Sequence, residues 1–414
     1  MSKALEPDTA QKNKRAAFWT RELWLLPILM LATLVRFYGS TASAIWCDEG
    51  SSLLMSQYSP ALIWFHSAHD VHPPLYYLLL HLWIEVFGNG ILSIRSMSVL
   101  PGIVTVALGV WLVHLVATRR AAVLAGVLLA LLPIAVRYSQ EVRMYSLMGL
   151  WLVGATIALV YWVKNPGRHR YLVIYALLMT ASFYTHYFTG LCVLSHWAYL
   201  FFIRDTKPRL ITRPAWWIAN GLIALLYAPW IPSLIDQLQH LEQLKVGGDV
   251  GWILPVTRYS LPSTLWQYLI LTDGLSLRWP LYFSLPLAVA LVAGAVALRD
   301  RGPYKFHVLL VTYTFLPLLV VFLISWVTPL LVERYLMFSA LGLPMVLAIA
   351  IDKIERHFRY VAIAMLMAIL GVELVGLRND YQVDDEQFDT LVSYVNQHYA
   401  ANDRIVVSDL FWYF

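Results

Sequence analysis

The chain has 414 residues, of which 59% are hydrophobic and only 13% are charged. Ordinary soluble domains carry charge on about a quarter of their residues, so this composition excludes a soluble globular protein and indicates an integral membrane protein. The net charge of +5 does not indicate nucleic-acid binding. The basic residues fall in short clusters between apolar runs, which is the pattern that orients membrane proteins.

Eleven apolar runs predict membrane-spanning helices. We expect them at residues 23–37, 93–116, 121–136, 147–163, 172–184, 191–203, 216–231, 281–298, 306–327, 335–351 and 361–377. Basic clusters alternate with the spans, which places the N-terminus in the cytoplasm. The predicted fold class is an all-α polytopic membrane protein with about 11 transmembrane helices, in the cell (plasma) membrane.

This topology divides the chain into three parts. Residues 1–22 form a cytoplasmic N-terminal tail, and residues 23–377 form the multi-span membrane domain. Residues 378–414 read as the start of a small α/β domain outside the membrane, with a helix at 384–399 and a strand at 403–407. We expect this domain to continue beyond the chain.

Two long outer loops are expected, at about residues 39–92 and 232–280. Part of the first loop, Leu75–Phe87, is apolar but short for a span, and it follows Pro73-Pro74. A helix lying in the membrane interface fits this segment better than a crossing.

Two adjacent carboxylates, Asp48 and Glu49, follow the first span. An ionisable residue close to hydrocarbon is costly, so it is a functional candidate by default. The alternative is that both carboxylates merely solvate a loop.

Three further polar segments lie on the outer side in this topology. They are His69-Asp70-Val71-His72-Pro73-Pro74-Leu75-Tyr76-Tyr77, the loop from Arg137 to Tyr145 around Glu141 and Arg143, and Glu333-Arg334-Tyr335. Plainer interpretations remain open for several basic residues. Arg36 and Arg95 could extend their charged ends to the lipid headgroups or pair there. Arg334 could form an ion pair with Glu333, and His186 could pack at the membrane interface.

The order and spacing of these segments resemble the C-type, lipid-linked-sugar glycosyltransferases. The resemblance is to the branch that holds protein O-mannosyltransferases and the aminoarabinose transferases of lipid A. It is carried by Asp48-Glu49, Asp70-Val71-His72-Pro73-Pro74-Leu75, Gly88…Ile94-Arg95-Ser96…Pro101-Gly102 and Gln140-Glu141-Val142-Arg143-Met144-Tyr145. It covers nearly the whole chain.

The resemblance implies transfer of a sugar from a polyprenyl or dolichyl phosphate to a glycan, lipid or protein acceptor outside the membrane. The family's acidic pair falls on Asp48 and Glu49, with Asp48 at the position of the base. Mannosyltransferases usually continue His-Pro-Pro-Leu with Gly-Lys, whereas this chain has Tyr76-Tyr77. The sugar and the acceptor are therefore left open.

The chemistry of the residues agrees with this function. Breaking a sugar–phosphate bond needs a base for the acceptor and cations for the leaving phosphate. We assign Asp48 and Glu49 to catalysis and expect the donor phosphate near Arg143, Arg334, Glu141 and Tyr145. Asp70, His72, Pro73 and Pro74 are expected to bind the acceptor or organise the loop. A divalent metal shared by Asp48 and Glu141 is left open.

The rival hypothesis is a transporter or flippase of lipid-linked glycans. A transporter typically carries charges near the bilayer midplane and interrupted helices in matching halves. Here the ionisable residues gather at one face and the halves show no symmetry, which favours an enzyme. The expected partners are the lipid donor, the acceptor and the bilayer, with no nucleic acid.

Overall fold

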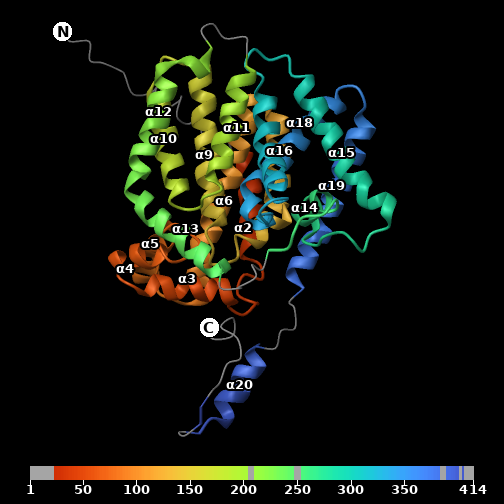
Figure 1. The fold of residues 1–414 in the computed structure, drawn as a ribbon. Coiled ribbons are helices and arrows are strands. Elements are labelled where there is room, and N and C mark those ends of the chain that lie inside the picture. The colour runs from red at the N-terminus through yellow and green to blue at the C-terminus, as the bar shows by residue number, and fades with distance from the viewer. Residues whose placement is uncertain (1–22, 204–208, 247–252, 383–387, 401–402, 405–414) are drawn as a thin grey trace, which may run out of the picture.

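The described residues fold almost entirely into helices (Figure 1). The computed structural model describes residues 23–203, 209–246, 253–382, 388–400 and 403–404, and these ranges contain no strand. Helices are the expected outcome for apolar runs in lipid, because a helix pairs its own N–H and C=O groups.

The first half of the chain forms α2 (Leu25–Phe37), α3 (Cys47–Gln57), α4 (Pro60–Ser67), α5 (Leu75–Phe87), α6 (Ile91–Val116), α7 (Arg119–Leu131), α8 (Pro133–Arg137), α9 (Tyr145–Lys164), α10 (Arg170–Phe183) and α11 (Thr189–Phe202). The second half forms η1 (Leu210–Thr212), α12 (Pro214–Tyr227), η2 (Ala228–Trp230), α13 (Ile231–Val246), α14 (Ser260–Ile270), α15 (Trp279–Leu298), α16 (Phe306–Ile324), η3 (Glu333–Leu336), α17 (Met337–Ala340), α18 (Gly342–Glu355), α19 (Arg359–Tyr381) and α20 (Phe388–His398).

Seven helical segments among the described residues are long and apolar enough to cross a membrane. They are α6, α9, the run from α12 to Gln239, α15, α16, the run from η3 to α18, and α19. Each of the eleven predicted ranges contains a helix. The prediction of a helical, polytopic membrane protein is therefore confirmed, and the number of eleven crossings stays a prediction.

The centre of the bundle is formed by α9 and α18, whose side chains are mostly buried. α9 packs against α6 and α10, and α18 packs against α7, α16 and α19. α12, α15 and α19 instead expose large apolar side chains, among them Trp217, Leu291 and Tyr360. Apolar surface on this scale marks contact with lipid.

The predicted interfacial helix is α5, with the bounds that the sequence indicated. α3, α4 and α5 contact one another and lie across one end of the bundle (Figure 1). α5 begins directly after Pro73-Pro74. Proline is favourable at the start of a helix, because the N–H groups of the first turn have no partner within the helix and proline has no N–H. This end of the bundle also carries the polar residues described below.

The predicted C-terminal helix at 384–399 corresponds to α20, which begins at Phe388 and ends at His398. Residues 384–387 lie outside the described residues. The same holds for residues 405–407 of the predicted strand, so the α/β domain stays a prediction.

Arg36, at the end of α2, has only 1% of its surface exposed. Its guanidinium donates to the carbonyls of Ala130 at 3.0 Å and Leu129 at 3.2 Å. In a continuous helix the Leu129 carbonyl would accept from residue 133, but Pro133 has no N–H. Arg36 therefore supplies a donor at the break between α7 and α8, and the snorkelling interpretation is wrong for this residue.

Arg95, in the first turns of α6, forms a buried ion pair with Glu49 of α3. Its Nε and Nη2 donate to the two carboxylate oxygens at 2.9 and 2.7 Å. The same guanidinium donates to the carbonyls of Ser40 and Ala44, in the connection between α2 and α3. Glu49 also accepts from the backbone N–H of Val142 at 2.8 Å. One ion pair thus joins α3, α6 and the connection that precedes α9.

We expect Arg95→Met to destabilise the protein by about 3–5 kcal/mol, because it leaves the Glu49 carboxylate buried without its cation. Thermal unfolding of the purified protein in lipid nanodiscs measures the effect. Arg168→Met changes an exposed side chain and is the matched control. An unchanged unfolding temperature for Arg95→Met would contradict this role of the ion pair.

Candidate active site

Asp48 and two arginines from distant parts of the chain meet at one point. Asp48 lies in the first turn of α3, Arg143 in the connection before α9, and Arg334 in η3. Asp48 Oδ2 is 3.2 Å from Arg334 Nη1 and 4.0 Å from Arg143 Nη2. The side chain of Asp48 is 23% exposed, whereas the neighbouring Glu49 is fully buried. Of the two adjacent carboxylates, Asp48 is therefore the one open to an incoming molecule.

Arg143 is held by two hydrogen bonds and by an aromatic ring. Nη1 donates to the backbone carbonyl of Asp48 and to Ser52 Oγ, both at 3.0 Å. The guanidinium carbon lies 5.9 Å from the centre of the Tyr145 ring. Nε is buried and has no hydrogen-bond partner among the described residues. Arg143 thus has a defined orientation and a donor available for a ligand.

Arg334 lies over an aromatic ring, with its guanidinium carbon 5.6 Å from the centre of Trp46. A cation above an aromatic face is attracted by the negative face of the ring. The neighbouring Glu333 accepts a hydrogen bond from the hydroxyl of Tyr138 at 3.2 Å. These contacts direct Arg334 toward Asp48, at the N-terminal end of the segment formed by α17 and α18.

Glu141 lies in the same connection as Arg143. Its carboxylate is 3.7 Å from Arg137 Nε, and its Oε2 is buried without a hydrogen-bond partner among the described residues. Burial raises the pKa of Glu141 to about 8, against the opposing charges of Arg137, Arg334 and Arg143. Near neutral pH this carboxyl group is therefore largely protonated and able to donate a hydrogen bond.

The divalent metal that the sequence left open between Asp48 and Glu141 does not fit this arrangement. A hard cation needs several ionised oxygen ligands. Asp48 contacts a guanidinium, and the Glu141 carboxyl is buried and largely neutral. In the part of the chain that the structure describes, no group of three or more His, Cys, Asp or Glu side chains is suited to a metal ion. The paired guanidinium groups suit an anion better than a cation.

The second polar segment, around Asp70 and His72, forms a hydrogen-bonded turn before α5. Tyr77 donates to Asp70 Oδ2 at 2.7 Å, and His72 Nδ1 is 3.9 Å from the same oxygen. Burial disfavours the ionised form of Asp70, but its hydrogen bonds outweigh burial and lower the pKa to about 2. Pro73 and Pro74 lead directly into α5. These residues restrict the conformation of the loop that lies beside the two arginines.

A cluster of rings packs beside the two arginines. His186 contacts four of its members. Its ring centroid lies 5.4, 6.0, 5.2 and 5.4 Å from those of His72, Tyr145, Tyr335 and Phe188. Phe188 completes the cluster, 5.3 Å from Tyr335. The sequence assigned His186 to interfacial packing, because a lone histidine after an apolar run carries no signal of its neighbours. The structure places it next to residues of the candidate site.

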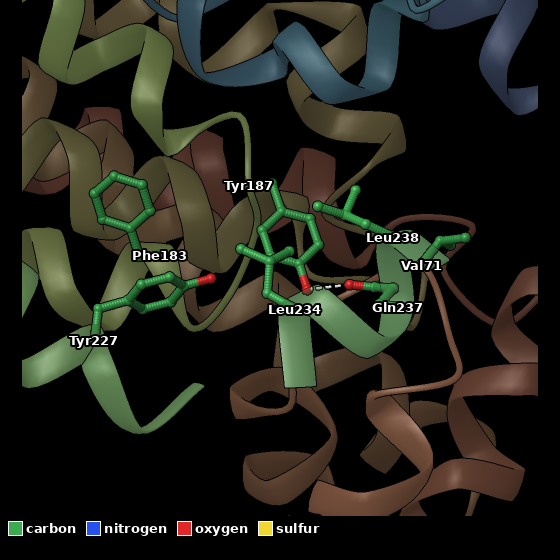
Figure 2. A pocket seen from close by; sticks show the side chains of 7 residues that line it. All are labelled: Val71, Phe183, Tyr187, Tyr227, Leu234, Gln237 and Leu238. Carbon is green, nitrogen blue, oxygen red and sulfur yellow. Dashed lines mark hydrogen bonds between the residues drawn. The ribbon is translucent and has the colours of Figure 1, made fainter. Parts of the chain in front are cut away.

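An apolar pocket of about 380 Å³ lies beside the Asp70–His72 turn (Figure 2). It is lined by Val71, Phe183, Tyr187, Tyr227, Leu234, Gln237 and Leu238. Figure 2 shows the Tyr187 hydroxyl directed at Gln237, to which it donates a hydrogen bond. Gln237, the buried residue of α13, in turn donates to the backbone carbonyl of Asp70. Hydrogen bonds through Gln237 of α13 therefore link the lining of the pocket to the loop that contains Asp70 and His72, which we call the site loop.

The raised pKa of Glu141 predicts a pH-dependent stability. The pKa is about 8 in the folded state and ordinarily 4.5, so the folded state binds this proton more tightly. The contribution of Glu141 to the free energy of unfolding is therefore greatest below about pH 4.5 and falls as the pH rises toward about 8. Glu141→Gln should remove this fall, which thermal unfolding in nanodiscs between about pH 5 and 8.5 measures.

Glu85→Gln, on an exposed side chain of α5, is the control and should keep the wild-type pH profile. An identical pH profile for Glu141→Gln and the wild type would show that Glu141 is ionised in the folded protein.

The fold has counterparts among known proteins. A family model described as Dolichyl-phosphate-mannose-protein mannosyltransferase matches residues 71–232. No curated protein matches the chain by sequence. The oligosaccharyltransferase of Archaeoglobus fulgidus in its apo form has a TM-score of 0.57 at 13% identity, over 92% of this chain and 59% of its own.

ArnT from Cupriavidus metallidurans is similar to the same degree. Its apo structure has a TM-score of 0.58 at 13% identity, over 86% of this chain and 75% of its own. Its structure bound to undecaprenyl phosphate has a TM-score of 0.56 at 13% identity, over 87% of this chain and 75% of its own. The chain thus spans about three fifths of the length of the A. fulgidus enzyme. The chain therefore shares the fold of these membrane glycosyltransferases, and its residues 71–232 match the mannosyltransferase family model, in line with the resemblance that the sequence indicates.

Proposed function

We propose that the chain is a membrane glycosyltransferase that moves a sugar from a polyprenyl-phosphate donor to a glycan, lipid or protein acceptor. One observation carries this proposal. A partly exposed carboxylate, Asp48, is held against two buried or half-buried guanidinium groups, Arg143 and Arg334, at the end of a membrane bundle. A base beside an anion-binding pair is what transfer from a phosphate requires.

In the proposed reaction, Asp48 accepts the proton of the acceptor's hydroxyl or amine. The acceptor atom then forms a bond to the anomeric carbon of the sugar, and the bond from that carbon to the phosphate oxygen breaks. The electron pair stays on the phosphate, which leaves on its lipid. Arg143 and Arg334 stabilise the negative charge of this leaving group through paired hydrogen bonds.

The remaining site residues have supporting roles in this proposal. Glu49 fixes the direction of Asp48 through its buried ion pair with Arg95. The largely neutral Glu141 and the hydroxyl of Tyr145 donate hydrogen bonds to the donor phosphate. Asp70, His72, Pro73 and Pro74 organise the loop that borders the acceptor.

The identity of the lipid donor is supported by two relatives. ArnT from Cupriavidus metallidurans has been solved with undecaprenyl phosphate, and AglB from Archaeoglobus fulgidus with an inhibitory peptide and a dolichol-phosphate. In this chain, the pocket in Figure 2 offers an apolar space of about 380 Å³ beside the site loop. We infer that it receives the part of the isoprenoid chain nearest the phosphate.

We further propose that residues 23–377 cross the plasma membrane eleven times, with the N-terminus in the cytoplasm and the loops of the site outside. The spacing of basic clusters supports this orientation. Residues 378–414 would then lie outside, where the last turn of α19 leads to the domain that contains α20. The rival transporter function has less support, because the polar cluster lies at one end of the bundle, beside α3, α4 and α5.

The orientation is tested by labelling in a chain whose Cys47 and Cys192 are replaced by serine. A cysteine at Asn89, between α5 and α6, should react with an impermeant maleimide in intact cells or spheroplasts. A cysteine at Arg168, between α9 and α10, should react only after permeabilisation. Both positions are exposed. Labelling of both from the same side would contradict the proposed topology.

The phosphate contacts are tested by replacing arginine with lysine. Arg143→Lys and Arg334→Lys keep the charge, but a single ammonium group cannot reproduce the two parallel hydrogen bonds of a guanidinium. We expect donor affinity and turnover to fall by about tenfold or more, because a hydrogen bond to a charged group contributes about 1.5–3 kcal/mol. Titration with polyprenyl-phosphate sugars in nanodiscs measures this.

Arg258→Lys is the matched control, since Arg258 is exposed and stacks on its neighbour Tyr259. Wild-type donor affinity in both site variants would show that the phosphate binds elsewhere.

The base is tested by Asp48→Asn, which keeps the shape of the side chain but cannot accept a proton. Turnover should fall by about a hundred- to ten-thousand-fold, with donor binding nearly unchanged. Single-turnover transfer from a radiolabelled polyprenyl-phosphate sugar separates the two effects. Asp236→Asn, on an exposed carboxylate of α13, is the control. Weakened donor binding with unchanged turnover would mean that Asp48 is a donor ligand rather than the base.

A further inference from the structure

His186, in the connection between α10 and α11, is buried with 3% of its surface exposed. Its Nδ1 accepts a hydrogen bond from the backbone N–H of Phe188 at 3.2 Å. A ring nitrogen that accepts carries no proton, so in the neutral imidazole the proton lies on Nε2. His186 therefore presents one N–H donor of fixed direction.

That donor has no acceptor among the described residues, and Nε2 itself is buried. The buried histidine of the bundle interior, His196, differs in this respect. Its Nε2 contacts Thr156 at 3.1 Å and its Nδ1 contacts Tyr175 at 3.3 Å. A buried donor left unpaired costs desolvation free energy, so its retention calls for a partner that the described residues do not supply.

The surroundings of His186 favour the neutral ring. Burial and the neighbouring charges of His72, Arg143 and Arg334 lower the pKa of His186 well below its ordinary value. A neutral N–H donor next to two guanidinium groups pairs with an oxygen acceptor rather than with another cation. The partner that suits this donor is therefore an oxygen acceptor, which a bound molecule can supply.

The rings around His186 indicate which oxygen this is. Tyr145 and Tyr335 flank the imidazole at 6.0 and 5.2 Å, and each ring also contacts an arginine of the site, at 5.9 and 5.8 Å. Each tyrosine ring thus contacts both the imidazole of His186 and a guanidinium group of the site. A sugar offers both features that this arrangement matches, hydroxyl acceptors and an apolar C–H face.

We propose that His186 Nε2 donates a hydrogen bond to a hydroxyl oxygen of the transferred sugar, in a subsite bordered by Tyr145 and Tyr335. The inference rests on the proposed function and adds to it a residue that determines which sugar is accepted. A site that hydrogen-bonds one hydroxyl discriminates strongly against an analogue that lacks it, because the buried donor is then left unpaired.

The test compares ligands with and without the sugar. The purified full chain in nanodiscs is titrated with undecaprenyl phosphate, with a panel of undecaprenyl-phosphate hexoses and pentoses, and with the monodeoxy analogues of the sugar that binds most tightly. His186→Phe keeps an aromatic ring and removes the donor. His169→Phe, on an exposed histidine before α10, is the matched control.

We expect His186→Phe to lose about ten- to a hundredfold in affinity for the sugar-bearing donor and to bind undecaprenyl phosphate as the wild type does. One monodeoxy donor lacks the hydroxyl that His186 binds. Its affinity for the wild type should equal the affinity of the complete donor for His186→Phe. Its affinity for His186→Phe should be no lower than its affinity for the wild type. His186→Gln, which retains an N–H donor, should recover part of the affinity. It also replaces His186→Phe if that variant does not fold.

Two results would overturn the inference alone. Equal losses for undecaprenyl phosphate and the sugar-bearing donor would mean that His186 binds phosphate, and unchanged sugar discrimination in His186→Phe would mean that its donor meets no sugar. A wild-type chain that binds none of these lipids would refute the proposed function, and the inference with it.

Discussion

The buried ion pair between Glu49 and Arg95 is the interaction on which the site depends. Consecutive residues of an α-helix point about 100° apart, so a carboxylate fixed inward at one position sets the direction of its neighbour. With Glu49 held against α6, Asp48 faces Arg143 and Arg334 and stays partly exposed. Two adjacent carboxylates thus have different environments because they lie on different faces of one helix turn.

The arginines of this end of the bundle differ in what balances their charge. Arg36 donates to carbonyls at the end of α7, where the helix dipole is negative. Arg95 forms a two-point pair with its own carboxylate. Arg143 and Arg334 both lie against the carboxylate of Asp48, and Arg143 Nε has no acceptor among the described residues. The first two guanidinium groups therefore bind groups of the chain that fix the fold, whereas the last two are the ones that we propose to bind the donor phosphate.

Much of the fold could be predicted from the sequence, because hydrocarbon imposes a simple rule. Apolar runs of sufficient length become helices, and even the short helix Leu75–Phe87 was predicted with the bounds that it has. The break between α7 and α8 was not predicted, although Pro133 marks it. A run of apolar residues hides such a break, and the compensating donor, Arg36, lies almost a hundred residues earlier in the chain.

The sequence indicates which residues form the candidate site better than it indicates what each residue contacts. Asp48, Arg143 and Arg334 were selected as polar residues near hydrocarbon, and the structure brings them together. That Glu49 is buried could not be predicted, because its partner comes from α6 and nothing in the local sequence separates two adjacent carboxylates. His186 lacked any signal for the same reason. Its neighbours His72, Tyr145 and Tyr335 come from three other segments. Only the assembled bundle therefore reveals an N–H that lacks an acceptor among the described residues and lies beside a pair of guanidinium groups.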